Sequence, residues 1–305
     1  MSLPGGYAGG ILRVDLSTGE IQRYTVTREL AQTWLGGNGL GVKILWEEVA
    51  PDVDPLSAGN ALIFATGPLT GTAWPCSGRM EAVAKSPLTG IYGDSNCGGY
   101  FGPELKFAGV DVIVITGVAS EPVSLWIHED EIGIEDARGL WGLDTIETEA
   151  SIRRLKGDNR IKVACIGPAG ENRVPFASIQ ATPNRSFGRA GLGAVMGSKR
   201  LKAIAVRGSL RVPLASAAEF STFARSIHQR IRDNEFFESI SRHGTSGLVP
   251  IVNEVGRFPT RNFQRGEYED ASKIDGNALR EQYWESDDGC FACPIRCDKV
   301  YRVRN

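Results

Sequence analysis

The most specific chemical signal in the sequence is a group of three cysteines. Cys290, Cys293 and Cys297 follow the spacing C-x2-C-x3-C. Such short spacings let one tight turn point several sulfurs at a common centre, and thiolates are the usual protein ligands of iron–sulfur clusters. We therefore expect these side chains to supply three ligands to a 4Fe-4S cluster in a redox enzyme, with the fourth ligand coming from elsewhere.

Other interpretations of the motif stay open. A zinc site needs four ligands, commonly cysteine or histidine, but His128, His228 and His243 lie far before the motif and form no paired pattern. Three buried structural thiols are the other alternative. The reverse order, C-x3-C-x2-C, belongs to radical enzymes that use S-adenosylmethionine, so that class is disfavoured. For the remaining cysteines, a packing role is preferred over a role as ligands: Cys76, Cys97 and Cys165.

Glycine is in excess, at 37 of 305 residues, and it gathers in polar loops at 36–41, 67–72, 95–102 and 185–193. Such loops expose backbone N–H groups, which bind phosphates or the polar edges of heterocycles. Arg79 and Arg185 lie beside two of the loops and would suit phosphate. Segment 36–41 does not fit a dinucleotide fingerprint, because it follows a predicted helix and lacks an acidic residue about 20 positions later. Glycine turns in a β-rich domain remain the simpler alternative for any single loop.

The elements that would position these residues are mostly strands up to residue 210. Alternating residues predict a hairpin from strands at 11–16 and 21–26, followed by a helix over 28–35 with Thr27 as its N-cap and an end at Gly36. Further strands are predicted at 61–66, 79–84, 110–116, 123–128, 161–166 and 203–207, and a helix over 144–155. Hairpins mix with helices without regular βαβα alternation, which favours an α+β fold.

The pattern changes after about residue 210. Amphipathic helices are predicted over 215–233 and 247–255, and strand signals nearly vanish. We assign residues 1–210 to an α+β domain and residues 211–305 to the beginning of a helical domain that carries the cysteine motif. We expect the chain to be part of a larger catalytic unit.

Bulk composition restricts the function classes. Hydrophobic residues make up 42% and charged residues 23% of the chain, and the net charge is −2. This balance gives no electrostatic case for binding nucleic acid or an anionic membrane. No apolar run is long enough to span a bilayer, and no basic segment followed by an apolar one marks a secretory signal. We expect a cytoplasmic protein, in which six cysteines are free thiols or metal ligands.

Seven segments, spread in order over nearly the whole chain, carry a family resemblance. They are WLGG at 34–37, GPLTGT at 67–72, KSPLTG at 85–90, GGYFGPELKFAG at 98–109, IGPAGEN at 166–172, GAVMGSK at 193–199 and the cysteine motif at 290–297. With these segments the chain resembles the N-terminal half of the aldehyde ferredoxin oxidoreductase family, which are tungsten, occasionally molybdenum, pterin enzymes.

The resemblance implies a base of two α+β subdomains that cradles two pyranopterin dithiolenes, whose four sulfurs hold the tungsten. The positions that match pterin-contacting residues are Arg79, Asn96, Gly98, Arg185, Ser186 and Gly188. Asn96 and Ser186 match positions whose backbone carbonyls hold a magnesium ion that bridges the pterin phosphates, in line with the preference of magnesium for oxygen ligands.

The function implied is oxidation of an aldehyde with water to a carboxylate, with electrons passed singly through the cluster to ferredoxin or a partner subunit. Two alternatives are the active-site subunit of a benzoyl-thioester reductase of the same family and a cofactor-binding module without turnover. The expected partners include neither nucleic acid nor membrane, and a homodimer is one assembly the resemblance allows. The fourth cluster ligand and the acid–base residues are expected beyond Asn305, so no catalytic residue is assigned here.

Overall fold

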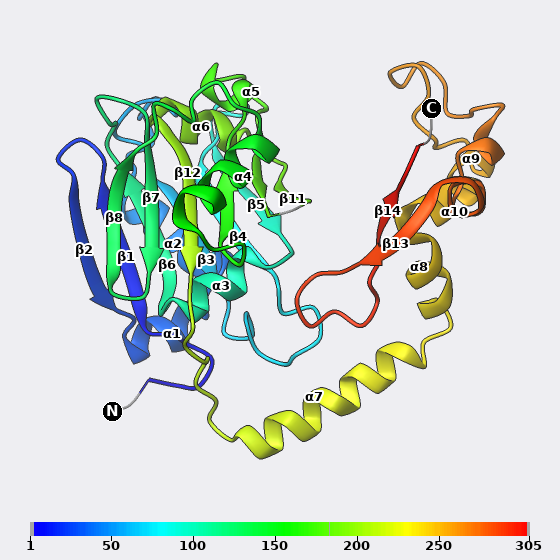
Figure 1. Ribbon diagram of the computed structural model, residues 1–305, viewed down its shortest axis with the longest axis horizontal. Coiled ribbons are helices and arrows are strands. Elements are labelled where there is room, and N and C mark those ends of the chain that lie inside the picture. Colours follow the sequence, from blue (N-terminus) through cyan, green and yellow to red (C-terminus); the bar gives the residue numbers. More distant parts are fainter. Residues whose placement is uncertain (1–2, 183, 304–305) are drawn as a thin grey trace.

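The computed structural model describes residues 3–182 and 184–303. Figure 1 shows two parts: a sheet-rich body formed by residues 10–207, and an arm formed by residues 217–301 that runs away from the body and returns toward it through a hairpin. No helix within the described ranges combines the length and the apolar character needed to cross a bilayer.

The body contains two six-stranded mixed sheets. The first has the order β2-β1-β6-β3-β4-β5, with strands β1 Gly10–Asp15, β2 Glu20–Thr25, β3 Leu62–Thr66, β4 Met80–Lys85, β5 Tyr92–Cys97 and β6 Val110–Thr116. The second has the order β11-β10-β9-β12-β7-β8, with strands β7 Val123–His128, β8 Glu131–Asp136, β9 Lys162–Cys165, β10 Ile179–Ala181, β11 Arg185–Phe187 and β12 Leu201–Arg207.

The two sheets have the same connectivity. Each begins with a hairpin, β1–β2 or β7–β8, which is followed by a helical segment and three antiparallel strands, β3–β5 or β9–β11. A helix and a last strand complete each sheet, and that strand, β6 or β12, pairs in parallel with the first strand of the hairpin. The helices of the first half are α1 Arg28–Trp34, α2 Asn38–Glu48 and α3 Phe101–Phe107; those of the second are α4 Thr145–Lys156, α5 Pro168–Glu171 and α6 Leu192–Ser198. The α+β class with two subdomains is thereby confirmed.

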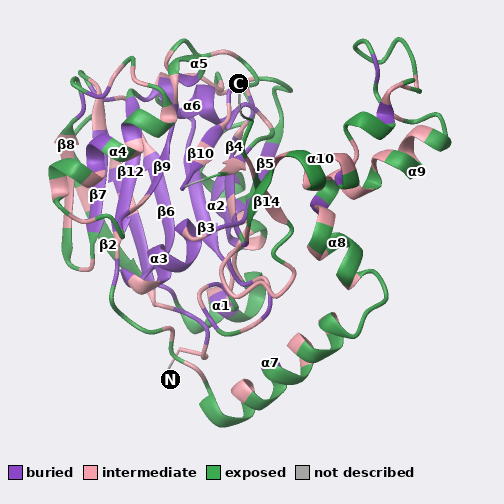
Figure 2. Ribbon diagram, turned by 45° about the vertical axis from the view of Figure 1, so that its right-hand side comes forward, coloured by how far each residue is buried: buried purple, intermediate pink, exposed green. Residues whose placement is uncertain are grey.

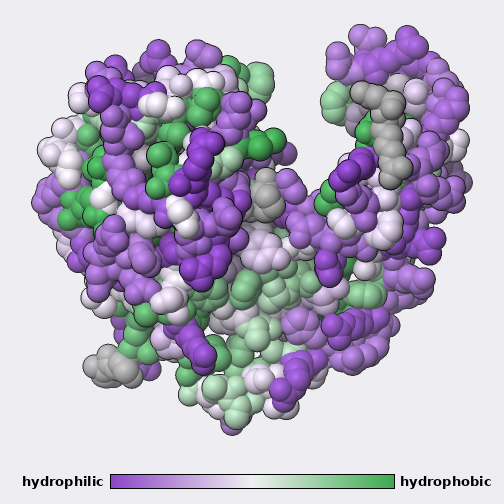
Figure 3. Space-filling view, in the orientation of Figure 1, coloured by the Kyte–Doolittle hydropathy of each residue, from purple (hydrophilic) through white to green (hydrophobic). Residues whose placement is uncertain are grey.

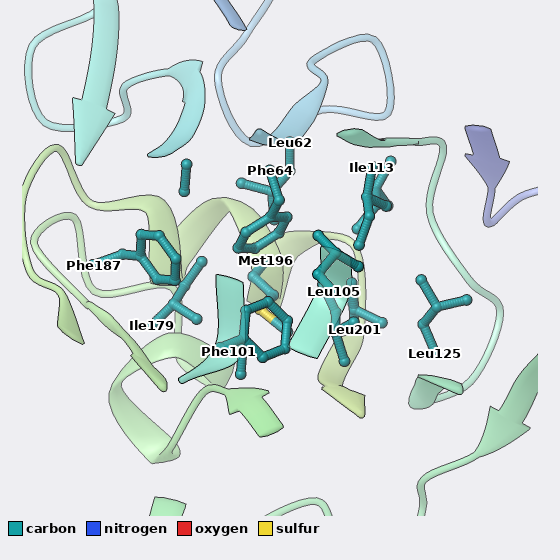
Figure 4. Close-up of a cluster of buried hydrophobic side chains, with 14 of the residues drawn as sticks. Leu62, Phe64, Phe101, Leu105, Ile113, Leu125, Ile179, Phe187, Met196 and Leu201 are labelled. Carbon is teal, nitrogen blue, oxygen red and sulfur yellow. The ribbon is translucent and has the colours of Figure 1, made fainter. Parts of the chain in front are cut away.

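The main core lies between the sheets. Strand residues alternate between opposite faces, so Leu62 and Phe64 of β3 face the core shared with the second sheet, whereas Ile63 faces the cluster under α1 and α2. Figure 4 shows the shared core, to which both sheets and helices α3 and α6 contribute. Helix α4 covers the outer face of the second sheet. The central strands have nearly continuous apolar sequences because both of their faces are buried.

Most predicted elements of the body are confirmed. The hairpin pairs Leu12 with Arg23 in register, and helix α1 is capped by the Thr27 hydroxyl, which accepts from the Leu30 N–H at 3.1 Å. Helix α4 has a capping box between Asp144 and Glu147. These elements were predictable because their signals are local.

The expectation of a simple glycine loop at 36–41 is wrong in part, because residues 38–41 form the first turn of α2. A Cβ at Gly41 would lie 2.7 Å from Cγ2 of Val83, so glycine lets this helix pack closely on β4. The start of this helix was not predicted because glycine, which recurs at 36–41, has a low helix propensity.

The arm consists of α7 Ala217–Arg232, α8 Phe237–His243, α9 Val249–Glu254 and α10 Gly276–Tyr283, two short 3-10 turns at Gly244–Leu248 and Ala271–Lys273, and the strands β13 Trp284–Asp288 and β14 Asp298–Tyr301. The antiparallel β13–β14 pair encloses the cysteine motif and corrects the expectation that strands nearly vanish here. Among the described residues, none of the three buried hydrophobic clusters includes one from the arm, and Figure 2 shows its helices as mostly exposed. The domain boundary near residue 210 stays a prediction.

Candidate functional site

The candidate site lies where the edge strands of the two sheets meet. Strand β5 is the edge of the first sheet, β11 is the edge of the second, and the two contact each other. Each is followed by a glycine and then by a helix, α3 or α6, so that Asn96-Cys97-Gly98 and Ser186-Phe187-Gly188 occupy equivalent positions in the repeated topology. The fold therefore brings the two groups of predicted pterin-contacting residues to one edge of the body.

Arg79 and Asn96 belong to one polar network on the first sheet. The Arg79 guanidinium donates to Oδ1 of Asn96 at 2.6 Å, and Nδ2 of Asn96 donates to Oε1 of Glu81 at 2.6 Å. The second carboxylate oxygen of Glu81 is buried without a hydrogen-bond partner. Burial, opposed by the hydrogen bond from Asn96, raises the pKa of Glu81. This unpaired acceptor in a polar network is suited to a ligand that donates a hydrogen bond.

A cavity of about 390 Å³ opens over this network. Its lining includes Gly37, Asn38, Gly67, Pro68, Thr70, Cys76, Arg79, Glu81 and Asn96. Two of the glycine-rich loops flagged in the sequence, 36–41 and 67–72, therefore meet the polar network. Cavities with a few convergent polar groups are the usual form of small-molecule sites.

Sequence reasoning missed two further polar residues, Tyr92 and Asp94, which contact Asn38 of the cavity lining. The Tyr92 hydroxyl donates to Oδ1 of Asn38, and Nδ2 of Asn38 donates to Oδ2 of Asp94 at 3.3 Å. Burial, and secondarily the negative charge of Asp94, raises the pKa of Tyr92 to about 12. The signal for Tyr92 and Asp94 was the polarity of β5, whose sequence is more typical of a loop than of a strand.

Arg185 connects the body to the cysteine motif. Its Nε lies 3.3 Å from Sγ of Cys290, and its Nη1 donates to the Asp298 carboxylate. Burial works to lower the pKa of Arg185, but the Cys290 sulfur and the Asp298 carboxylate outweigh it and raise the pKa. Arg185 was expected as a pterin-contacting residue, and here its guanidinium also reaches the predicted cluster ligands.

Ser186 and Gly188 leave space beside Arg185. The Ser186 hydroxyl accepts a hydrogen bond from Nε2 of Gln180 at 3.3 Å. The main chain of Ser186 belongs to β11, the edge strand of the second sheet. A Cβ at Gly188 would meet only Ser186, at 3.4 Å or more. Backbone groups on edge strands include carbonyls and N–H groups that no neighbouring strand pairs, so this edge can present them to a ligand.

The cysteine loop at 290–297 is docked on the body by backbone contacts. The Phe291 N–H donates to Gly99 O at 3.2 Å, and the Phe291 ring lies edge-on to the rings of Tyr100 and Phe107 at 6.3 and 5.9 Å. A Cβ at Gly98 would lie 2.8 Å from Sγ of Cys290, so glycine is needed for this close approach. Figure 3 shows the open hollow between body and arm.

The cysteines differ in their surroundings. Cys290 and Cys293 are half-buried and Cys297 is exposed. Sγ of Cys293 lies 3.5 Å from Sγ of Cys76. The hydrogen bond from Cys76, together with the backbone N–H groups of Arg296 and Ile295, lowers the pKa of Cys293 to about 5. A depressed pKa favours the thiolate, which is the form that binds metals.

The other cysteines were interpreted as packing residues. Cys97 and Cys165 are buried members of hydrophobic clusters, and burial raises the pKa of each to about 12. Cys76 is different, because its thiol is directed at Cys293 across 217 positions of sequence. No pattern in the sequence indicated that contact.

The residues present fit the groups that the resemblance implies. Two arginines, an orphaned carboxylate oxygen and the open space at Gly188 suit a phosphate-bearing heterocycle. Three thiols share one loop, as a cluster requires. Within the described residues, no three cysteine, histidine or acidic side chains are already placed to hold a metal ion. The thiols thus share a loop but are not pre-gathered, which is common when metal binding itself completes a site.

Comparisons with known proteins show which family the chain resembles along its whole length. The family model "Aldehyde ferredoxin oxidoreductase, N-terminal domain" matches residues 11–208, and the model for "domains 2 & 3" of the same family matches residues 222–305. Tungsten-containing aldehyde ferredoxin oxidoreductases of Pyrococcus abyssi and Pyrococcus furiosus are each 48% identical, over 97% and 98% of this chain. The chain spans about half the length of these relatives, 49% in each case.

A solved structure shows a similar arrangement. The active site complex BamBC of benzoyl coenzyme A reductase, in complex with 1,5 dienoyl-CoA, aligns with a TM-score of 0.86 and 32% sequence identity, covering 99% of this chain and 48% of that one. With a matching model for its body, a second for its arm and relatives of this similarity, the chain belongs to the aldehyde ferredoxin oxidoreductase family.

Proposed function

We propose that this chain is part of a tungsten-pterin oxidoreductase that oxidises an aldehyde with water to a carboxylate and passes the electrons through a 4Fe-4S cluster to ferredoxin or a partner subunit. The observation that carries the proposal is the 48% identity to tungsten-containing aldehyde ferredoxin oxidoreductases over nearly the whole chain. Because the chain spans half of those relatives, the activity is proposed for the whole protein.

The chain's own contribution would be to hold the cofactors. Arg79 and Arg185 would neutralise the pterin phosphates, because guanidinium groups match phosphate oxygens in pairs. Gly188, where a Cβ would meet only Ser186, would let the cofactor approach the backbone. Gly98, which the resemblance also matches to a pterin contact, would bind through its main chain. The backbone carbonyls of Asn96 and Ser186, on the two facing edge strands, would bind magnesium, which prefers oxygen ligands and phosphates. When bound, a tungsten bis-pyranopterin supplies the two-electron oxidation of the aldehyde.

Cys290, Cys293 and Cys297 would ligate the cluster. The loop that carries them is docked beside the predicted pterin contacts, with Sγ of Cys290 3.3 Å from Nε of Arg185. A cationic side chain between the two cofactor sites would stabilise the negative charge of a cluster thiolate and of a phosphate together. This short separation supports an electron relay adjacent to the pterin.

A second candidate is reduction of an aromatic thioester. The observation that favours it is the TM-score of 0.86 with BamBC of benzoyl coenzyme A reductase. The lower identity of that match, 32% against 48% for the aldehyde ferredoxin oxidoreductases, favours the aldehyde reaction.

The test uses the natural-length protein purified without oxygen. Metal analysis should find tungsten or molybdenum, iron and magnesium, and a panel of aldehydes should reduce a one-electron viologen acceptor. Activity with benzoyl-coenzyme A and not with aldehydes would favour the second candidate. Full aldehyde activity after tungsten, molybdenum and pterin are lost would contradict the proposal.

Two variants, each with a matched control, test the proposed cluster and pterin contacts. Cys297→Ser should lose iron, whereas Cys165→Ala, a matched control whose thiol lies in the core of the second sheet, should keep it. Arg185→Met should lower the pterin content, and Arg138→Met, which breaks an exposed pair with Asp136, should not. Unchanged iron in Cys297→Ser would remove that residue from the ligand set.

A further inference from the structure

Cys76 is a fourth thiol at the cysteine loop. Its Sγ lies 3.5 Å from Sγ of Cys293 and is placed to donate a hydrogen bond to it. Neither of the other two cysteines of the body makes such a contact: Cys97 is directed at Gly98 O and Cys165 at Thr145 O. Position 76 thus differs from both in facing the proposed cluster ligands.

The backbone of Cys76 is itself held against the cysteine loop. The Cys76 N–H donates to Ala292 O at 3.2 Å. Cys76 has φ +60, in the left-handed region that non-glycine residues rarely adopt. A non-glycine residue keeps such a conformation where its surroundings require it. A strained backbone that directs a thiol at Cys293 indicates a use for that thiol.

The segment around Cys76 is held on both sides. The Ser77 hydroxyl donates to Thr72 O at 2.7 Å, and Gly71 N–H donates to Ser77 O at 3.0 Å. A Cβ at Gly78 would lie 2.3 Å from Gly99 O and 3.2 Å from Phe291 N, so this turn is packed directly against the cysteine loop. The thiol of Cys76 therefore keeps its place when the loop is docked.

The sulfur–sulfur distance distinguishes a donor from a ligand. In a cubane cluster each cysteine binds a different iron, so the ligating sulfurs lie at separate corners and not in contact. A separation of 3.5 Å suits a hydrogen bond between a neutral thiol and a ligand sulfur. It is far longer than the roughly 2.05 Å of a disulfide. Cys76 is thus placed to act through Cys293 and not to replace it.

We propose that Cys76 is a positioning residue that donates an S–H hydrogen bond to the sulfur of Cys293 and thereby raises the reduction potential of the cluster. This inference rests on the proposed function, because it requires a cluster at Cys290, Cys293 and Cys297. Hydrogen bonds to the ligand sulfurs stabilise the more negative, reduced cluster, and they are one of the determinants of its potential.

The experiment compares Cys76→Ala, Cys76→Ser and the control Cys165→Ala in the natural-length holoenzyme. Iron and acid-labile sulfide are counted, and the midpoint potential is measured by a redox titration followed by electron paramagnetic resonance. Cys76→Ala should keep its iron but shift to a more negative potential. Cys76→Ser, which retains a donor, and Cys165→Ala should stay near the unsubstituted protein.

Each contrary outcome has a distinct meaning. A Cys76→Ala protein with full iron and an unchanged potential would overturn the inference and leave the proposed function intact. Loss of iron in Cys76→Ala but not in Cys165→Ala would make Cys76 a ligand and also overturn it. Absence of iron and sulfide from the unsubstituted protein would overturn the cluster itself, and with it both proposals.

Discussion

Replacing Lys106 with methionine should strongly destabilise the body. Lys106 lies in the last turn of helix α3. Its Nζ lies 2.5 Å from Oδ1 of Asp111, and the two side chains are 0% and 1% exposed. Nζ also donates to Gly6 O at 2.6 Å, and the Asp111 carboxylate accepts from the N–H groups of Ala8 at 3.1 Å and Gly9 at 2.6 Å. Burial lowers the pKa of Lys106, and Asp111 opposes this. The pair joins the N-terminal segment to the helix that follows the Gly98 turn of the site.

The magnitude follows from the burial. Lys106→Met leaves a carboxylate buried without its cation, which costs about 3–5 kcal/mol. At about 2–4 °C per kcal/mol this lowers the Tm by roughly 6–20 °C. The double variant Lys106→Met/Asp111→Asn removes both charges and should lie within about 1–2 kcal/mol of the unsubstituted protein, because a buried ion pair is often nearly neutral against uncharged replacements.

The assay is urea unfolding followed by tryptophan fluorescence and circular dichroism, with the change read from the midpoint at a constant m value. Arg13→Met is the control. Arg13 and its partner Glu48 are 37% and 30% exposed, and an exposed ion pair contributes about 1 kcal/mol or less to stability. The reasoning is refuted if Lys106→Met costs no more than Arg13→Met. It is also refuted if the double variant is as unstable as the sum of the two single variants.

Three further predictions concern pH, the cysteine loop and the arm. Lys199 donates to two backbone carbonyls, and burial lowers its pKa from 10.5 to about 8. Between pH 8 and 10.5 the unfolded chain therefore binds a proton at Lys199 that the folded protein does not. The free energy of unfolding should rise with pH over this range, by at most roughly 3 kcal/mol. Urea unfolding should show this rise in the unsubstituted protein and not in Lys199→Met. An equal rise in the two proteins would contradict the prediction. Gly78→Ala places a Cβ 2.3 Å from a backbone oxygen and should reduce bound iron, whereas Gly133→Ala meets nothing within 4 Å and should not; equal iron contents would count against the docked loop. A fragment of residues 1–216 should melt cooperatively, but the isolated arm, whose helices α8 and α9 bury no residue, should show no near-ultraviolet melting transition; a cooperative melt of the arm would disprove this.

Local signals in the sequence determined much of this protein. Apolar runs predicted most of the strands that are buried on both faces, such as β6 and β12, because each such strand carries its own pattern. The cysteine spacing indicated a cluster loop, since the three thiols are adjacent in the chain. Strands β5 and β11 escaped prediction, because edge strands need not be apolar and their polar residues read as loops.

Only the tertiary structure decided which of these segments meet. The cysteine spacing predicted three ligands but could not place Cys76 against Cys293 or Arg185 against Cys290. Both contacts arise because two sheets of equal topology pack face to face, so that β5 and β11 adjoin and the cysteine loop docks over them. Contacts of this kind depend on how distant surfaces fit together, and no local pattern of residues records that fit.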